Sequence, residues 1–190
     1  MTIVMNNRTI SEKIYLITLF IWVVVTSLVT TTYFIRLEGF LSLYRILLYF
    51  TIAMILIKEL MNFPKTLYYF RFHWQQLLIV MGLFIAMFIV AKNRDGLLDI
   101  NVLLLVFSAR DIDFRKLLGT FSVATFLVLC LTIYASQQGI IANMFMKADS
   151  GYRFSLGFNY VSFASQRLFF ALCTYLMFRG KRVSYLELLA

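Results

Sequence analysis

The stretch LLGTFSVATFLVLCLTIYA, residues 117–135, carries no charged side chain and decides the fold class. As an α-helix rising about 1.5 Å per residue, it would be nearly 30 Å long, which matches the hydrocarbon core of a bilayer. Much of the chain has the same character, because 62% of its 190 residues are hydrophobic and only 14% are charged. A soluble core of this size cannot enclose so much apolar surface. We therefore predict an integral membrane protein, for which the lipid bilayer is an expected partner.

The apolar runs are continuous, whereas a membrane β-barrel would alternate apolar and polar residues along each strand. We therefore expect an all-α, polytopic helical membrane protein forming a single membrane domain with about six transmembrane helices, the fourth of them short. The expected spans are residues 14–35, 40–57, 74–91, 96–109, 117–135 and 161–178. A long polar loop, residues 136–160, separates the last two spans.

The 18 Lys and Arg residues predict the orientation of these spans. If the N-terminus is cytoplasmic, most of them fall in cytoplasmic segments, as the positive-inside rule requires. This predicts a multi-pass protein of the cell membrane with both termini in the cytoplasm and residues 136–160 outside. The formal charge is +9, but the cations are spread between apolar runs and form no patch, so nucleic acid is not an expected partner.

Three ionisable residues fall within apolar runs and need an explanation, because charges at membrane depth are costly. Arg45 and Asp99 lie near the ends of their runs, where their side chains can reach the interface. Arg167 lies about two turns into the last run, behind the polar residues 162–166. Arg167 has two interpretations: it either binds an anion or pairs with local carbonyl groups.

No metal or organic cofactor is expected from this sequence. Cys130 and Cys173 both fall in apolar segments without the CxxC spacing of a zinc site or a disulfide framework, and we interpret them as small hydrophobic residues. The single histidine, His73, precedes Trp74 in a connection, where an interfacial position is the simplest interpretation.

The loop before the last span is rich in residues that recognise ligands. Tyr152, Arg153, Phe158 and Asn159 occur there among glycines and serines. A guanidinium can form a fork onto a phosphate or diphosphate, and aromatic rings can hold sugar faces or a lipid carrier near the interface. A merely solvated loop remains the alternative.

Two stretches resemble the N-terminal part of Wzy-type polysaccharide polymerases of Gram-positive bacteria. SARDIDFRKLL at residues 108–118 is similar to a cytoplasmic connection of that family, A-R/K-D-I-D-F-K/R-K. RFSLGF at residues 153–158 is similar to its extracellular element R-x-S-L-G-F, and the two occur in the same order. The family often continues into His-Pro-Asn, whereas this chain has NYVS at residues 159–162.

The resemblance implies transfer of a growing glycan from its undecaprenyl diphosphate carrier to an incoming lipid-linked repeat unit, for capsule or exopolysaccharide. It implies that Arg153 and Arg167 bind the diphosphate and that Tyr152, Phe158 and Asn159 contact glycan or lipid. It identifies no catalytic base, and the partners it implies are lipid-linked oligosaccharide and other capsule-assembly membrane proteins.

Such polymerases have more spans and a second large extracellular loop, so the resemblance implies an N-terminal fragment, truncated at the C-terminus and inactive alone. The alternative function is a non-enzymatic membrane component, or a transporter-like subunit, of a glycan-assembly system.

Overall fold

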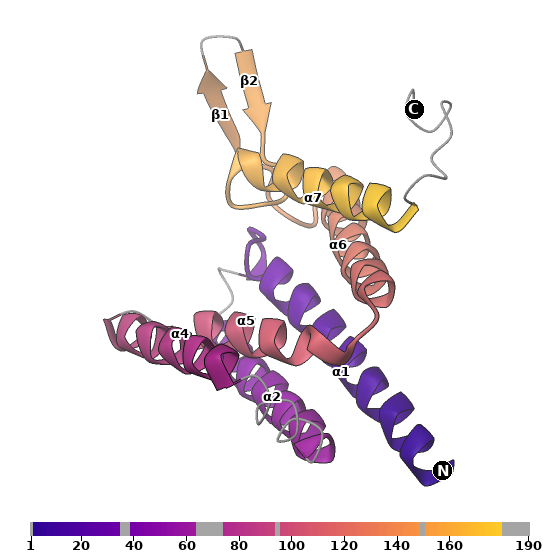
Figure 1. Cartoon of the computed structure of the whole chain (residues 1–190). Coiled ribbons are helices and arrows are strands. Elements are labelled where there is room, and N and C mark those ends of the chain that lie inside the picture. Colours follow the sequence, from indigo (N-terminus) through magenta and orange to yellow (C-terminus); the bar gives the residue numbers. More distant parts are fainter. Residues whose placement is uncertain (1, 35–38, 64–73, 94–95, 149–150, 180–190) are drawn as a thin grey trace. The chain divides into compact units, whose positions relative to one another are not determined.

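The computed structural model describes residues 2–34, 39–63, 74–93, 96–148 and 151–179 (Figure 1). Helices dominate these residues, and the only sheet among them has two strands, so the predicted all-α class is confirmed. The chain divides into two compact units, each made of two segments. Unit 1 consists of Met1–Leu19 and Arg45–Ile112, and unit 2 consists of Phe20–Tyr44 and Asp113–Ala190.

The helices are α1 (Thr2–Leu28), α2 (Phe40–Met61), α4 (Trp74–Asn93), α5 (Leu97–Ser108), the 3-10 turn η2 (Ala109–Asp111), α6 (Phe114–Gln137) and α7 (Val161–Arg179). Four of these helices are long and apolar enough to cross a membrane: α1 from Thr9 onward, α2, α6 and α7. The chain is therefore a helical membrane protein, as predicted. Its orientation across the bilayer stays a prediction.

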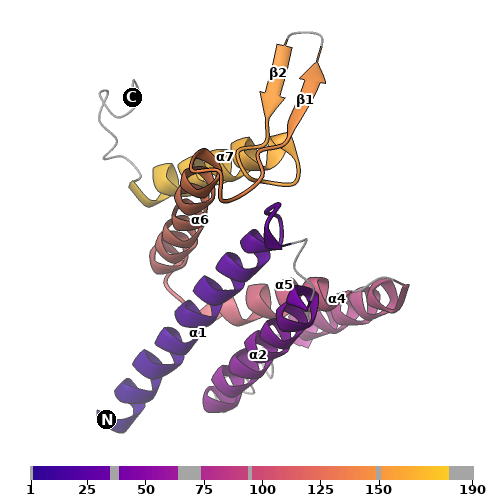
Figure 2. The same cartoon turned by 180° about the vertical axis from the view of Figure 1, so that it is seen from behind.

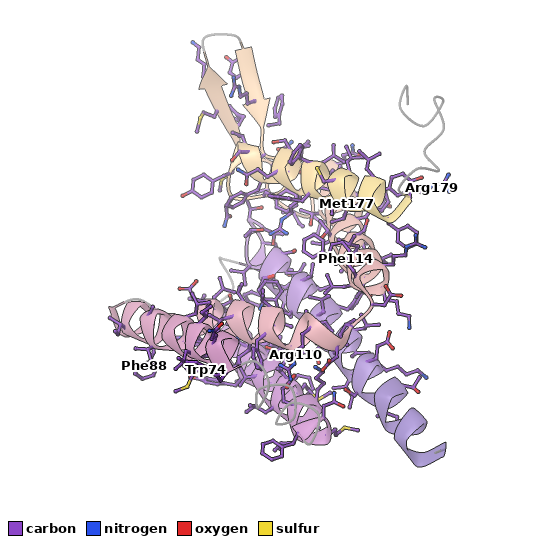
Figure 3. All side chains as sticks on the ribbon, viewed as in Figure 1. Trp74, Phe88, Arg110, Phe114, Met177 and Arg179 are labelled. Atoms are coloured by element: carbon purple, nitrogen blue, oxygen red, sulfur yellow. The ribbon has the colours of Figure 1, made fainter. Side chains whose placement is uncertain are left out.

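Large apolar side chains cover the outer surfaces of the helices. On α4, Trp74 is 61% exposed and Phe88 is 69% exposed, and both point away from the helix (Figure 3). Such surfaces are unfavourable in water and suit lipid. The expected short span corresponds to α5, whose 12 residues extend only about 18 Å.

The first helix ends earlier than its hydropathy predicts. An apolar run was expected to residue 35, but α1 ends at Leu28. The hydroxyl of Thr30 donates to Ser27 O at 2.6 Å, and that of Thr31 donates to Leu28 O at 2.7 Å. These bonds occupy the last helical carbonyls, and consecutive β-branched residues favour extended backbone, so the threonines terminate the helix.

A polar seam joins the elements of unit 1. The buried residues of α2 recur at helical spacing and are Leu48, Thr51, Ile55 and Lys58. The buried residues of α5 have the same spacing and are Asn101, Leu105 and Ser108. Each of these two faces therefore mixes apolar and polar groups.

Side-chain hydrogen bonds hold this seam together. Thr51 Oγ1 donates to Asn101 Oδ1 at 2.5 Å, which joins α2 to α5. Asn62 Nδ2 donates to Ser11 Oγ at 2.6 Å, which joins the end of α2 to α1. In a membrane protein, where lipid is as apolar as the side chains, such polar contacts give helix association its specificity.

In unit 2, α6 packs along α7 around a small apolar core. Its buried members are Leu129, Phe158 and Ala164, and the partly buried members are Ile133, Leu156 and Phe163. Phe158 comes from the segment between the hairpin and α7, and its side chain is fully buried. The long loop is therefore tied into the helical core.

The expected loop also contains a β-hairpin, which projects beyond α6 and α7 when seen from either side (Figures 1 and 2). Strand β1 (Phe145–Ala148) pairs antiparallel with β2 (Gly151–Phe154). Four residues extend only about 13 Å, so the hairpin is short.

The turn after the hairpin depends on a glycine. Gly157 has φ +90°, a conformation in which a side chain is strained. A Cβ atom on Gly157 would lie 3.0 Å from Cγ2 and 3.1 Å from the carbonyl oxygen of Thr132, on α6. Both the backbone conformation and the close approach to α6 therefore require glycine.

Gly157→Ala is expected to destabilise the protein by roughly 2–4 kcal/mol, through left-handed strain plus overpacking. Gly139→Ala is the matched control, because Gly139 also has a positive φ, +72°, but open space around it. Its expected cost is only about 1 kcal/mol. Thermal unfolding in detergent measures both changes, and equal losses would contradict the close-approach argument.

Candidate functional site

The cation Arg167, in the second turn of α7, is held by two hydroxyl groups and an aromatic ring. Its Nη1 donates to Ser27 Oγ at 2.5 Å, and its Nη2 donates to Thr30 Oγ1 at 3.1 Å. The guanidinium carbon lies 5.9 Å from the ring centroid of Phe158, a cation–π distance. We call these four residues the Arg167 site.

Backbone hydrogen bonds fix the elements that supply this site. Thr32 N donates to Gly157 O at 2.9 Å, and Asn159 N donates to Thr30 O at 2.9 Å. Thr31 and Phe158 form an isolated antiparallel bridge between these two segments. These backbone contacts join the end of α1 to the loop before α7, and we call them the strap. The strap positions the two hydroxyl groups and the ring of the Arg167 site.

The charge of Arg167 has no acidic partner in the described part of the chain, where its hydrogen-bond partners are both neutral. A guanidinium has five N–H donors, and two nitrogen atoms are used here. The side chain is half-buried. An uncompensated cation at membrane depth is costly, and an anionic ligand would stabilise it. Of the two interpretations that the sequence left open, an anion site or pairing with local carbonyls, the described hydrogen bonds do not show the second, because both partners of Arg167 are hydroxyls.

Next to Arg167 along α7, a shallow open hollow of about 520 Å³ is lined by Ser165, Gln166, Phe169 and Phe170. Gln166 and both phenylalanines are exposed, and Arg167 is not among the lining residues. This surface combines polar and aromatic groups at the start of an otherwise apolar helix.

The structure separates the predicted ligand residues of the loop. Arg153 is exposed on β2 and lies opposite Met146 of β1. Because successive residues of a strand point to opposite faces, Tyr152 and Arg153 cannot act on one ligand from the same face of the hairpin. No described contact joins Arg153 to Arg167.

The other two predicted ligand residues support the fold of unit 2. Phe158 is fully buried and presents its ring to Arg167, so it positions that side chain and presents no open face to a sugar. Asn159 is half-buried and contributes its backbone N–H to the strap.

The remaining singled-out residues lie apart from this site. Arg45 is exposed in the second turn of α2, and Asp99 is half-buried in the first turn of α5. Cys130 is exposed and Cys173 is half-buried, and both are free thiols. His73 lies outside the described residues.

Unit 1 contains a second cluster of charged residues, centred on Glu59 of α2. Its Oε1 accepts hydrogen bonds from Lys58 Nζ at 2.8 Å and from Ser108 Oγ. Its Oε2 accepts one from Arg110 Nη2 at 2.6 Å. The carboxylate therefore joins α2 to the end of α5 and to η2, where Figure 3 labels Arg110.

Lys58 is the most deeply buried charge of this cluster, with a fully covered side chain. Besides Glu59, it donates to Ser108 O at 2.7 Å and lies 5.9 Å from the ring centroid of Tyr15. Tyr15 in turn donates its hydroxyl to Leu105 O at 2.9 Å. The cluster therefore fastens α1, α2 and α5 within unit 1.

Several residues of these two clusters were not predicted from the sequence. Ser27 and Thr30 belong to a run rich in hydroxyls at residues 26–32, which was the available signal. The adjacent charges Lys58 and Glu59 at the end of an apolar run were the signal for the second cluster. The motif at residues 108–118 contributes Ser108 and Arg110 to it.

No family model matches this sequence, and neither a curated protein nor a solved structure is significantly similar to it. The family resemblance of residues 108–118 and 153–158 is therefore a prediction.

Glu59→Ala is expected to destabilise the protein by about 3–5 kcal/mol, because it leaves the buried Lys58 without its carboxylate. Adding Lys58→Met removes the uncompensated charge and is expected to recover part of that loss. Asp111→Ala is the control: its side chain is 48% exposed, and its carboxylate is 3.7 Å from Arg110 and 4.0 Å from Lys58. Thermal unfolding in detergent measures all three variants. A double variant no more stable than Glu59→Ala would contradict the claim that the loss comes from leaving Lys58 without its carboxylate.

Proposed function

We propose that this chain is a polysaccharide polymerase-like membrane protein that handles undecaprenyl-diphosphate-linked repeat units in capsule or exopolysaccharide synthesis. The observation that carries the proposal is Arg167, a cation within a helix apolar enough to cross a membrane, held by Ser27, Thr30 and Phe158 without an acidic partner among the described residues. The two stretches that resemble Wzy-type polymerases support the choice of substrate.

A diphosphate is the anion that this site suits best. Arginine matches phosphate oxygens with a planar fork of donors, and this guanidinium is already oriented by two hydroxyls. When a glycosyl group is transferred, the bond from the sugar to the diphosphate breaks and negative charge grows on the leaving oxygen. A fixed cation in a low-dielectric setting stabilises that charge without reorganising.

Arg153 is assigned a separate step on the same substrate. Its side chain on β2 is exposed and makes no described contact with Arg167, so it can attract an approaching diphosphate by its charge. Arg167 then binds the anion where the backbone is rigid. Substitutions of the two arginines should therefore have different effects. Loss of Arg153 should slow association of the diphosphate, and loss of Arg167 should weaken its equilibrium affinity.

The alternative is a transporter-like or non-enzymatic subunit of a glycan-assembly system, and the polar seam of unit 1 favours it. Buried polar side chains between membrane helices commonly mark pathways for solutes or ions. Here Thr51, Lys58 and Asn101 are fully buried on helices that are otherwise apolar. A transporter role predicts that seam substitutions, and not Arg167 substitutions, control glycan export.

Arg167→Ala is expected to weaken binding of undecaprenyl diphosphate by the purified protein in nanodiscs by roughly 10- to 100-fold, because the charged hydrogen bonds are lost. Arg167→Lys keeps the charge but loses the fork, so it should fall between Arg167→Ala and the unchanged protein. Native mass spectrometry with added undecaprenyl diphosphate measures all three.

Arg115→Ala is the matched control, because Arg115 is an exposed cation at the start of α6. It should bind as the unchanged protein does. Thermal unfolding of each variant separates lost binding from lost folding. Full affinity in a folded Arg167→Ala variant would remove the site from the proposal, and unchanged glycan chain length in cells producing it would favour the alternative.

A further inference from the structure

The hairpin has two chemically different faces. Directly paired residues share a face, so the register places Phe145 with Phe154, and Lys147 with Tyr152, on one side. We call these four residues the aromatic face. The other side carries Met146 and Arg153.

The rings of the aromatic face are uncovered. Phe145 is 66% exposed, Tyr152 is 62% exposed and Phe154 is 55% exposed. Phe145 and Tyr152 form an edge-to-face pair with centroids 5.9 Å apart, so the face has a defined shape. In both views the hairpin extends away from the two helices of unit 2 that flank it (Figures 1 and 2).

The base of the hairpin is fixed to its own connection. Ser155 N donates to Met144 O at 2.8 Å, and Met144 N donates to Ser155 Oγ at 3.0 Å. Leu156 N donates to Asn143 Oδ1 at 3.0 Å. We call these hydrogen bonds, between the end of α6 and the start of α7, the clasp. Because α6 and α7 are both long and apolar enough to cross a membrane, we expect the clasp to lie near the membrane surface.

We propose that the aromatic face docks onto the headgroup region of the bilayer, with Lys147 facing the phosphates of anionic lipids. Tyrosine and other aromatic rings concentrate at this depth, because their apolar bodies enter the acyl boundary while polar groups stay hydrated. The charged residue of the aromatic face, Lys147, is a cation, which complements an anionic lipid surface.

A bilayer fits this face better than a glycan or a protein does. The face adjoins a membrane boundary through the clasp, so docking needs no second molecule. Lysine has a long apolar stem and can lie along the surface with its ammonium group among phosphates. In the docked hairpin, Arg153 points away from the lipid and remains accessible from water, as a capturing cation requires.

The test uses nitroxide spin labels on the whole chain carrying Cys130→Ala and Cys173→Ala. Labels are placed at Tyr152→Cys or Phe154→Cys on the aromatic face, and at Met146→Cys on the opposite face as the matched control. The protein is reconstituted into vesicles of phosphatidylglycerol and phosphatidylcholine. Power saturation compares collisions with oxygen, which enriches in lipid, and with a nickel chelate, which stays in water.

We expect the accessibility of the labels to alternate between the two faces of the strand. Labels at 152 and 154 should collide mainly with oxygen, and the label at 146 should collide mainly with the nickel chelate. Lys147→Glu should lower the ratio of docked to undocked label about fivefold in anionic vesicles. It should have a much smaller effect in pure phosphatidylcholine. Thermal unfolding of each labelled protein shows that the fold is kept.

Equal nickel accessibility at all three positions in a folded protein would overturn the proposal. If the labels on the aromatic face lose accessibility to the nickel chelate only after soluble oligosaccharide is added, the face binds glycan and the proposal is overturned too. If the accessibility of these labels to the nickel chelate falls as the protein-to-lipid ratio rises, the face contacts a second copy of the chain, and this also overturns the proposal. None of these results depends on whether Arg167 binds diphosphate.

Discussion

The strap between the end of α1 and the segment before α7 is the constraint on which unit 2 depends. Thr32 N reaches Gly157 O, and Asn159 N reaches Thr30 O, both at 2.9 Å. Backbone that leaves a helix near lipid must satisfy its polar groups within the protein, and these two segments satisfy each other. The burial of Phe158 and the hydroxyls beside Arg167 both follow from that pairing. The conformation of Gly157 follows as well, because only a glycine allows the segment to reach α6.

Hydropathy predicted the helical membrane class because transfer into lipid depends on composition averaged over a whole segment. It could not predict that α1 ends at Leu28, because Thr30 and Thr31 are acceptable to a bilayer while their hydroxyls compete for helical carbonyls. The hairpin was missed for a similar reason: strands of four residues give too short a pattern to distinguish from a polar loop.

For the candidate site, the sequence identified the cation but not its surroundings. Arg167 is conspicuous because an arginine inside an apolar run is rare. Its partner Ser27 lies 140 residues away, and no local pattern reports a contact over that separation. Tyr152 and Arg153 were grouped because they are adjacent, but strand geometry places adjacent residues on opposite faces. Glu59 was missed because charges at helix ends usually meet water, whereas this one meets Lys58, Ser108 and Arg110.

The shortness of α5 has a consequence for the electric field across the membrane. Its 12 residues cover only about 18 Å, against roughly 30 Å of hydrocarbon, so on the predicted topology, in which α5 crosses the bilayer, lipid beside it would thin or water would enter at its ends. A transmembrane voltage that falls over the shorter path gives a field steeper by about 1.7-fold. Arg110 and Asp111, in the turn η2 that follows α5, would then lie at one end of that path. A short membrane-crossing helix would thus concentrate the membrane potential over a smaller distance without any change in the charge that the chain carries.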